Sequence, residues 1–138
     1  MGSDFEITIV EKNDSEANRL INIAIKEISR IESLISSWDK NSQTTLINYY
    51  SGIKPVKVDT ELFNLISRSI KVSNLSQGAF DISYASLDKV WFFNKKMQKM
   101  PSDDQIANSV AKVGFENIIL NEKEQTVFLK LKGMKIGF

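Results

Sequence analysis

The fold is decided largely by residues 77–93, whose sequence is QGAFDISYASLDKVWFF. Gly78 can adopt backbone angles that are closed to other residues, so the chain can turn sharply there. If the segment is extended, Phe80 and Ile82 point into a core while Asp81 points the other way. The pattern fits either one wall of a pocket for a flat ligand or an ordinary buried corner, and the chemistry alone favours the corner.

Composition indicates one globular domain spanning residues 1–138. The chain is 42% apolar and 25% charged, and its 18 basic residues nearly balance its 17 acidic residues. These shares are those of a folded soluble protein. The sequence contains no block of basic residues. Its charge pattern therefore does not support binding to nucleic acid or to a membrane surface.

The chain contains neither cysteine nor histidine. This excludes disulfides, thiol chemistry, zinc sites of the Cys/His kind and imidazole bases. Any bound metal is therefore expected to be a hard cation on oxygen ligands, such as magnesium or calcium. Neither a signal peptide nor a transmembrane run is visible in the sequence.

The first half of the chain predicts a strand followed by two long helices. Residues 4–10 alternate apolar and polar side chains, which predicts a half-buried strand. A helix is expected from about Ser15 to Ser36, and a second one from Asp59 to near Ser76. The apolar stripe of the first helix is interpreted as core; it consists of Ala17, Leu20, Ala24, Ile28, Ile31 and Ile35.

The remaining patterns are short. Residues 42–48 predict a short helix, and residues 55–58 predict a strand near a sheet edge because Pro55 lacks an N–H. Ser102 and Gln105 have the spacing of a capping box, and residues 116–121 and 126–131 predict a hairpin. Strands and helices do not alternate strictly, so the expected class is α+β, with a largely antiparallel sheet packed with two long helices.

Gly137 and Phe138 stand in the middle of an apolar segment that begins at Lys135 and predicts a further strand. Two interpretations fit, a short final strand or an N-terminal piece of a longer domain. An unfinished strand at a sheet edge exposes unpaired N–H and C=O groups. We therefore predict self-association or strand exchange through this C-terminal segment, unless the chain is part of a larger domain.

Several motifs, weak singly but ordered along the whole chain, resemble the N-terminal half of the ApbE family. Its members are flavin transferases that move FMN from FAD onto target proteins. The matching segments are Met1-Gly2-Ser3, residues 30–38 ending in Ser37-Trp38, residues 42–48 ending in Asn48, Gly78-Ala79-Phe80-Asp81-Ile82 with Leu87 and Trp91, and Val113-Gly114-Phe115 with Ile118. The resemblance implies an incomplete, N-terminal part of an ApbE-like fold.

The resemblance also implies which residues contact the flavin cofactor. They are Met1, Trp38, Ala79, Phe80 and Asp81. For Phe80 we expect contact through the backbone, with the side chain packed inside. The structural alternatives remain open: Met1 as an initiator residue, Trp38 as a lid over the first helix, and Asp81 as a cap for a neighbouring segment.

The family's Gly-rich segment with a lysine and its Asp-x-x-Thr metal motif would follow the end of this sequence. No catalytic residue and no metal ligand is therefore assigned within residues 1–138. The Lys95, Lys96 and Lys99 run is interpreted as solvated surface.

By resemblance, the function is that of an FAD:protein FMN transferase, which moves FMN from FAD to a threonine of a target protein with magnesium. This fragment is expected to be inactive alone. The alternatives are a non-catalytic FAD-binding protein and an FAD pyrophosphatase that releases FMN and AMP. The implied partners are FAD and a flavin-acceptor protein, and the implied location is extracytoplasmic, periplasmic and lipid-anchored.

Overall fold

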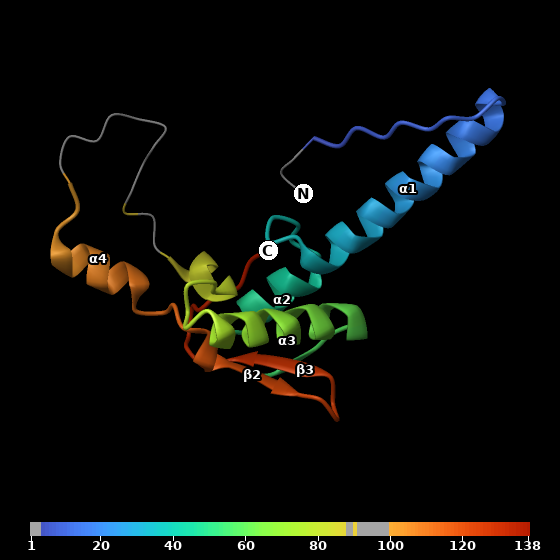
Figure 1. Ribbon diagram of the computed structural model, residues 1–138. Helices are drawn as coiled ribbons and strands as arrows, with labels where there is room; N and C mark the ends of the chain where they lie inside the picture. The colour runs from blue at the N-terminus through green and yellow to red at the C-terminus, as the bar shows by residue number, and fades with distance from the viewer. Residues whose placement is uncertain (1–3, 88–89, 91–99) are drawn as a thin grey trace.

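The computed structural model describes residues 4–87, 90 and 100–138 (Figure 1). Its elements are α1 (Asp14–Ile35), α2 (Gln43–Tyr49), β1 (Val56–Lys57), α3 (Thr60–Leu75), the 3-10 helix η1 (Ile82–Ser86), α4 (Asp103–Val110), the 3-10 helix η2 (Phe115–Asn117), β2 (Ile118–Asn121) and β3 (Thr126–Leu129). Among the described residues, no helix has the length and apolar character needed to cross a membrane.

The described strands form one antiparallel sheet in the order β1-β3-β2. The β2–β3 hairpin pairs Ile118 with Leu129 and Asn121 with Thr126, as the sequence predicted. Strand β1 lies at the edge and pairs only with β3, which fits the neighbouring Pro55. The predicted α+β class with an antiparallel sheet is confirmed.

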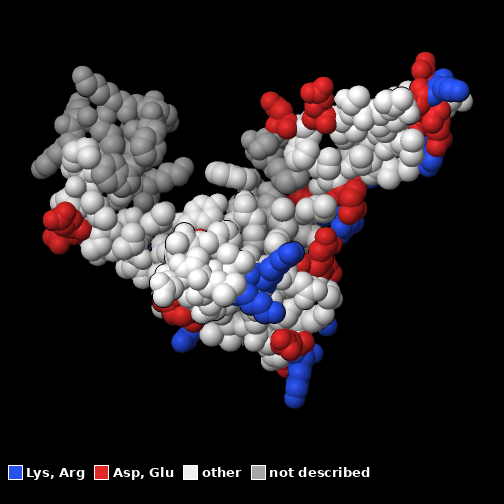
Figure 2. Space-filling model, viewed as in Figure 1, with Lys and Arg blue, Asp and Glu red and all other residues white. Residues whose placement is uncertain are grey.

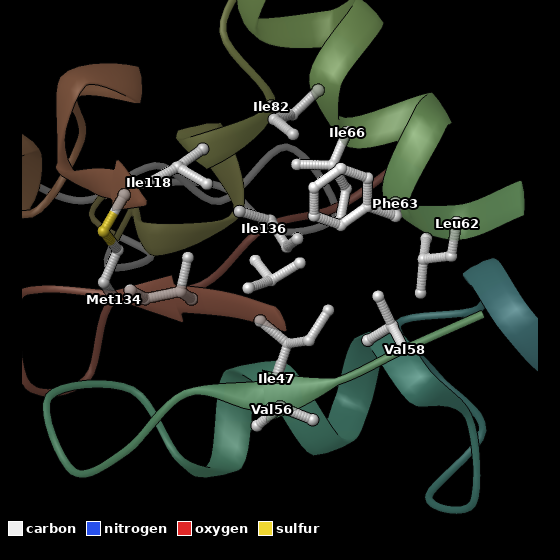
Figure 3. Close-up of a cluster of buried hydrophobic side chains, with 12 residues drawn as sticks. Ile47, Val56, Val58, Leu62, Phe63, Ile66, Ile82, Ile118, Met134 and Ile136 are labelled. Carbon is white, nitrogen blue, oxygen red and sulfur yellow. The ribbon is translucent and has the colours of Figure 1, made fainter. Parts of the chain in front are cut away.

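The core lies between α3, α2 and the inner face of this sheet (Figure 3). Ile66 of α3, Val127 of β3 and Ile136 near the C-terminus are fully buried. Side chains from elements that are distant in the sequence converge there: Ile47, Val56, Val58, Leu62, Phe63, Ile66, Ile82, Ile118, Val127, Leu129, Met134 and Ile136.

The starts of α1, α2 and α4 follow the capping signals of the sequence, whereas Asp59 takes the N-cap position of α3 without the predicted side-chain bond. The Asn13 side chain accepts hydrogen bonds from the N–H groups of Ser15 and Glu16 at the start of α1. Ser42 caps α2 by accepting from Thr45 N–H, and Ser102 forms the predicted capping box with Gln105. These side chains satisfy N–H groups that have no partner within their helix.

Helix α1 projects away from the rest of the molecule and touches it mainly at its C-terminal end (Figure 1). Leu34 is its only buried residue, and its carbonyl accepts from the Thr44 hydroxyl at 3.0 Å. Arg30 reaches Glu61 of α3 at 2.7 Å, and its hydrogen bond to Glu27 holds the pKa of that carboxyl below its ordinary value. The prediction that the apolar stripe of α1 is core holds only at the C-terminal end, where Ile35 packs against the core cluster. The other stripe residues are half-buried, because the described core does not extend along the helix.

Two predicted strands are also absent. Residues 4–10 are not assigned to a strand, and within the described residues no backbone hydrogen bond joins them to another element. Residues 135–138 do not form a strand either. The alternating pattern requires a neighbouring strand before it can become part of a sheet, and the three described strands do not lie beside either segment.

Leucines at the two ends of α3 provide a test of this core. Leu62 is 1% exposed and Leu75 is 86% exposed. Leu62→Ala is expected to lower the free energy of unfolding by about 2–5 kcal/mol, because the loss of buried methyl groups leaves a cavity. Leu75→Ala should change it by less than about 0.5 kcal/mol. Urea unfolding followed by circular dichroism measures both, and equal losses would contradict the described core.

Candidate functional site

The predicted corner, residues 76–82, begins where α3 ends. Gly78 N–H donates to the Ser73 carbonyl at 2.9 Å, and Gln77 N–H donates to the Asn74 carbonyl at 3.2 Å. This pair of bonds is a Schellman motif. Gln77 and Gly78 have φ values of 53° and 83°, so the chain reverses sharply at the predicted glycine.

Asp81 fastens this corner to a second turn. One carboxylate oxygen accepts from Ser83 N–H at 2.7 Å, and the other accepts from Phe115 N–H at 2.9 Å. The Ser83 hydroxyl accepts from Gly114 N–H at 2.8 Å. The carboxylate thus caps η1 and also holds Phe115, while Ser83 holds Gly114. This is the structural role that the sequence left open beside ligand binding.

The corner presents part of its apolar surface to solvent. Ile82 is 2% exposed, but Phe80 is 44% exposed. The expectation that the Phe80 side chain packs inside is therefore wrong: after the turn at Gly78, Ile82 enters the core and Phe80 stays at the surface. Figure 2 shows an uncharged surface over the C-terminal end of α3, where Val72 and Leu75 are exposed as well.

Residues 133–137 run through the core beside η1 and are held by side chains instead of a strand. Asn48 Nδ2 donates to the Ile136 carbonyl at 3.0 Å, and Ile136 N–H donates to Asn48 Oδ1 at 2.8 Å. The Ser86 hydroxyl bonds both the N–H and the carbonyl of Lys135 at 2.8 Å. Because these N–H and C=O groups have hydrogen-bond partners, the segment is not the open sheet edge that the sequence predicted. Self-association of the chain stays a prediction.

Gly137 lies where three parts of the chain meet. A Cβ added there would stand 3.2 Å from the Ala85 Cβ, 3.3 Å from the Ser37 hydroxyl and 3.3 Å from the Tyr84 hydroxyl. Its N–H donates to the Ile82 carbonyl at 2.9 Å. The absence of a side chain therefore permits the loop after α1 to lie against η1, and the C-terminus lies beside that loop (Figure 1).

The loop after α1 presents Trp38 with 85% of its surface exposed. The backbone around it is fixed: the N–H groups of Trp38 and Asp39 donate to the Ser36 hydroxyl at 3.2 and 3.1 Å. The Ser36 carbonyl accepts from the buried Ser42 hydroxyl. A flat, unburied ring on a rigid loop suits stacking against a planar ligand.

The Trp38 loop and η1, the 3-10 helix that Asp81 caps, thus meet at Gly137. It gives no direct contact between Trp38 and residues 79–81. Met1, Trp91 and the lysines at 95, 96 and 99 lie outside the described residues. No group of three acidic side chains capable of holding a metal ion occurs within the described part of the chain.

Sequence reasoning missed Tyr84, which is 53% exposed beside Gly137. The quoted stretch contains Tyr84, three residues after Asp81, and its N–H donates to the Asp81 carbonyl at 3.2 Å. Phe138, 41% exposed, is a further aromatic neighbour of Gly137 in the sequence.

The sequence matches the ApbE family over residues 1–138, and the chain therefore belongs to this family. Among curated relatives, an FAD:protein FMN transferase of Buchnera aphidicola subsp. Schizaphis graminum is 29% identical over 120 residues, which are 84% of this chain and 35% of the relative. One of Klebsiella pneumoniae is 27% identical over 99% of this chain and 42% of its own length. The chain spans about two fifths of these relatives.

Solved structures agree on the fold. The crystal structure of the ApbE protein from Thermotoga maritima is 25% identical, with a TM-score of 0.74 over 94% of this chain and 41% of that one. The flavin transferase ApbE from Vibrio cholerae, as an H257G mutant, gives a TM-score of 0.76 at 18% identity over 94% of this chain and 44% of that one.

Asn48 offers a test of the bonds that hold this site. Asn48→Ala removes both partners of Ile136, and each buried backbone group left unsatisfied costs about 1–3 kcal/mol. The free energy of unfolding should fall by that order, whereas Asn64→Ala at an exposed position of α3 should leave it within about 0.5 kcal/mol. Urea denaturation of both variants measures the difference. An unchanged Asn48→Ala midpoint would contradict the described bonds.

Proposed function

We propose that this chain provides flavin-binding surface of an FAD:protein FMN transferase. The observation that supports this most directly is the meeting at Gly137 of the Trp38 loop and η1, whose N-cap is Asp81. The sequence relatives carry that transferase name. The activity of the whole protein is part of the proposal, since this chain spans about two fifths of their length.

Each predicted residue has a role that its surroundings permit. Trp38 offers a free ring face for stacking on the isoalloxazine or the adenine ring. Ala79, which is exposed and small, lets a ligand approach the backbone closely. Phe80 offers its half-exposed ring as well as its backbone, and Met1 would complete the set as the resemblance implies.

The Asp81 carboxylate can hold a ligand while it keeps its structural bonds. Each of its oxygens accepts one backbone N–H, and an ionised carboxylate has about four acceptor positions. The remaining positions can accept from a ribose hydroxyl or a ring N–H. The two bonds already present also fix the orientation of the carboxylate, which lowers the entropic cost of binding.

The proposed reaction is a phosphoryl transfer. The hydroxyl oxygen of a target threonine forms a bond to the FMN phosphorus of FAD, the P–O bond to AMP breaks, and the hydroxyl proton is lost. Magnesium, when bound, would neutralise charge on the pyrophosphate oxygens. This chain's residues bind and orient the flavin, and the metal ligands belong to the remainder of the family domain.

The proposal includes an extracytoplasmic location, which is supported by the family resemblance.

Binding of FAD can be measured on this chain directly. Titration with FAD is expected to quench tryptophan fluorescence, and Trp38→Ser should weaken the FAD affinity, measured by calorimetry, roughly tenfold because a stacking contact is lost. Since Trp38 is 85% exposed, the free energy of unfolding should not change. Tyr49→Ser, at another exposed aromatic outside the predicted set, is the matched control. Equal affinities for all three proteins would overturn the role of Trp38.

The transfer reaction needs a separate assay. With FAD, magnesium and an acceptor protein, the chain alone is expected to leave the acceptor mass unchanged, because it lacks the family's metal motif. A mass increase by one FMN unit in the acceptor would refute the expected inactivity and establish the transferase. Release of AMP and free FMN without labelling of the acceptor would favour an FAD pyrophosphatase. FAD binding without release of AMP or FMN and without labelling would match a non-catalytic FAD-binding protein.

A further inference from the structure

Two side-chain hydroxyls meet beside Gly137, where the Trp38 loop and η1 come together. The hydroxyl oxygens of Ser37 and Tyr84 each lie 3.3 Å from the position that a Cβ on Gly137 would occupy. Ser37 belongs to the loop after α1, whereas Tyr84 belongs to η1. Because both oxygens lie close to the same point, the polar groups of one ligand can bond both of them.

Neither of these hydroxyls forms a hydrogen bond with another residue in the described part of the chain. The neighbouring serine hydroxyls all bond the backbone: those of Ser36 and Ser83 accept from N–H groups, and that of Ser86 bonds Lys135. The loop and η1 are therefore fixed without the hydroxyls of Ser37 and Tyr84, which remain free to bond a ligand.

Both hydroxyls lie next to the surface proposed to stack on a ring. Tyr84 is 53% exposed and Trp38 is 85% exposed, while Ser37 is half-buried directly before Trp38 in the chain. Each hydroxyl can donate one hydrogen bond and accept two. A large planar ligand on the face of Trp38 can thus present its polar edge to Ser37 and Tyr84.

We propose that the hydroxyls of Ser37 and Tyr84 bind the polar edge of the FAD ring whose face stacks on Trp38. This inference rests on the proposed function. The isoalloxazine edge carries an N–H between two carbonyls, and the adenine edge carries an amino group beside a ring nitrogen. Stacking on Trp38 accepts any flat ring, so the two hydroxyls determine specificity for a ring with donors and acceptors on its edge.

Removal of single hydroxyls tests this proposal on the chain itself. Tyr84→Phe keeps the aromatic ring, and calorimetry should show that its FAD affinity is roughly three- to tenfold weaker, the effect of one neutral hydrogen bond. Ser37→Ala should weaken it similarly. Tm should change by less than about 2 °C in both variants, because no bond within the protein is lost. Tyr49→Phe, at a tyrosine that is 72% exposed outside the site, is the matched control and should keep the full affinity.

The absorption spectrum of bound FAD identifies which ring the hydroxyls contact. A hydrogen bond to the isoalloxazine edge perturbs the visible band of the flavin, so Tyr84→Phe would shift that band relative to the unsubstituted chain. Weaker binding with an unshifted band would assign the hydroxyls to the adenine edge. Either spectrum, together with the loss of affinity, agrees with the proposal.

The outcomes separate this inference from the proposed function. Equal FAD affinities of Tyr84→Phe, Ser37→Ala and Tyr49→Phe would overturn the inference and leave the proposed function intact. A loss of affinity accompanied by a clearly lower Tm would overturn it too, since the hydroxyls would then support the fold. If the unsubstituted chain does not bind FAD, the proposed function fails and this inference fails with it.

Discussion

The backbone of residues 133–137 passes through the core without a strand beside it, and much of the structure depends on how its polar groups are satisfied. Met134 and Ile136 are fully buried, so the backbone polar groups around them need partners within the protein. Asn48, Ser86 and the Ile82 carbonyl take the place of a neighbouring strand. Each such group would otherwise carry a desolvation cost of about 1–3 kcal/mol, which ties α2 and η1 to this segment.

The same bonds position the candidate site. They place Gly137 at a spot where a Cβ would crowd Ala85, Ser37 and Tyr84, so the absence of a side chain lets the Trp38 loop and η1 lie against it. The backbone of both elements is fixed by further hydrogen bonds, from Ser36 in the loop and Asp81 in the corner. Exposed aromatic rings on fixed backbone suit recognition of a flat ligand, because little order has to be gained on binding.

Local signals in the sequence were reliable guides. Ser42 and Ser102 begin helices, Gly78 follows the end of α3, and residues 118–129 form a hairpin, all as predicted. Each of these features depends on contacts between residues a few positions apart. Of the predicted site elements, the Trp38 loop meets η1 at Gly137 and residues 79–81 lead into η1. The Phe80 side chain was predicted inside but lies at the surface.

The sequence by itself determined where elements start and stop, which side of each is apolar, and which family the residues resemble. It could not determine what covers an apolar side. Periodicity gave α1 and residues 4–10 the pattern of buried elements, yet the apolar residues of both are only partly buried, because burial requires a partner that periodicity does not specify. Only the tertiary structure decided that residues 133–137 are held by Asn48 and Ser86, since hydrogen bonds across 88 and 49 positions leave no local pattern.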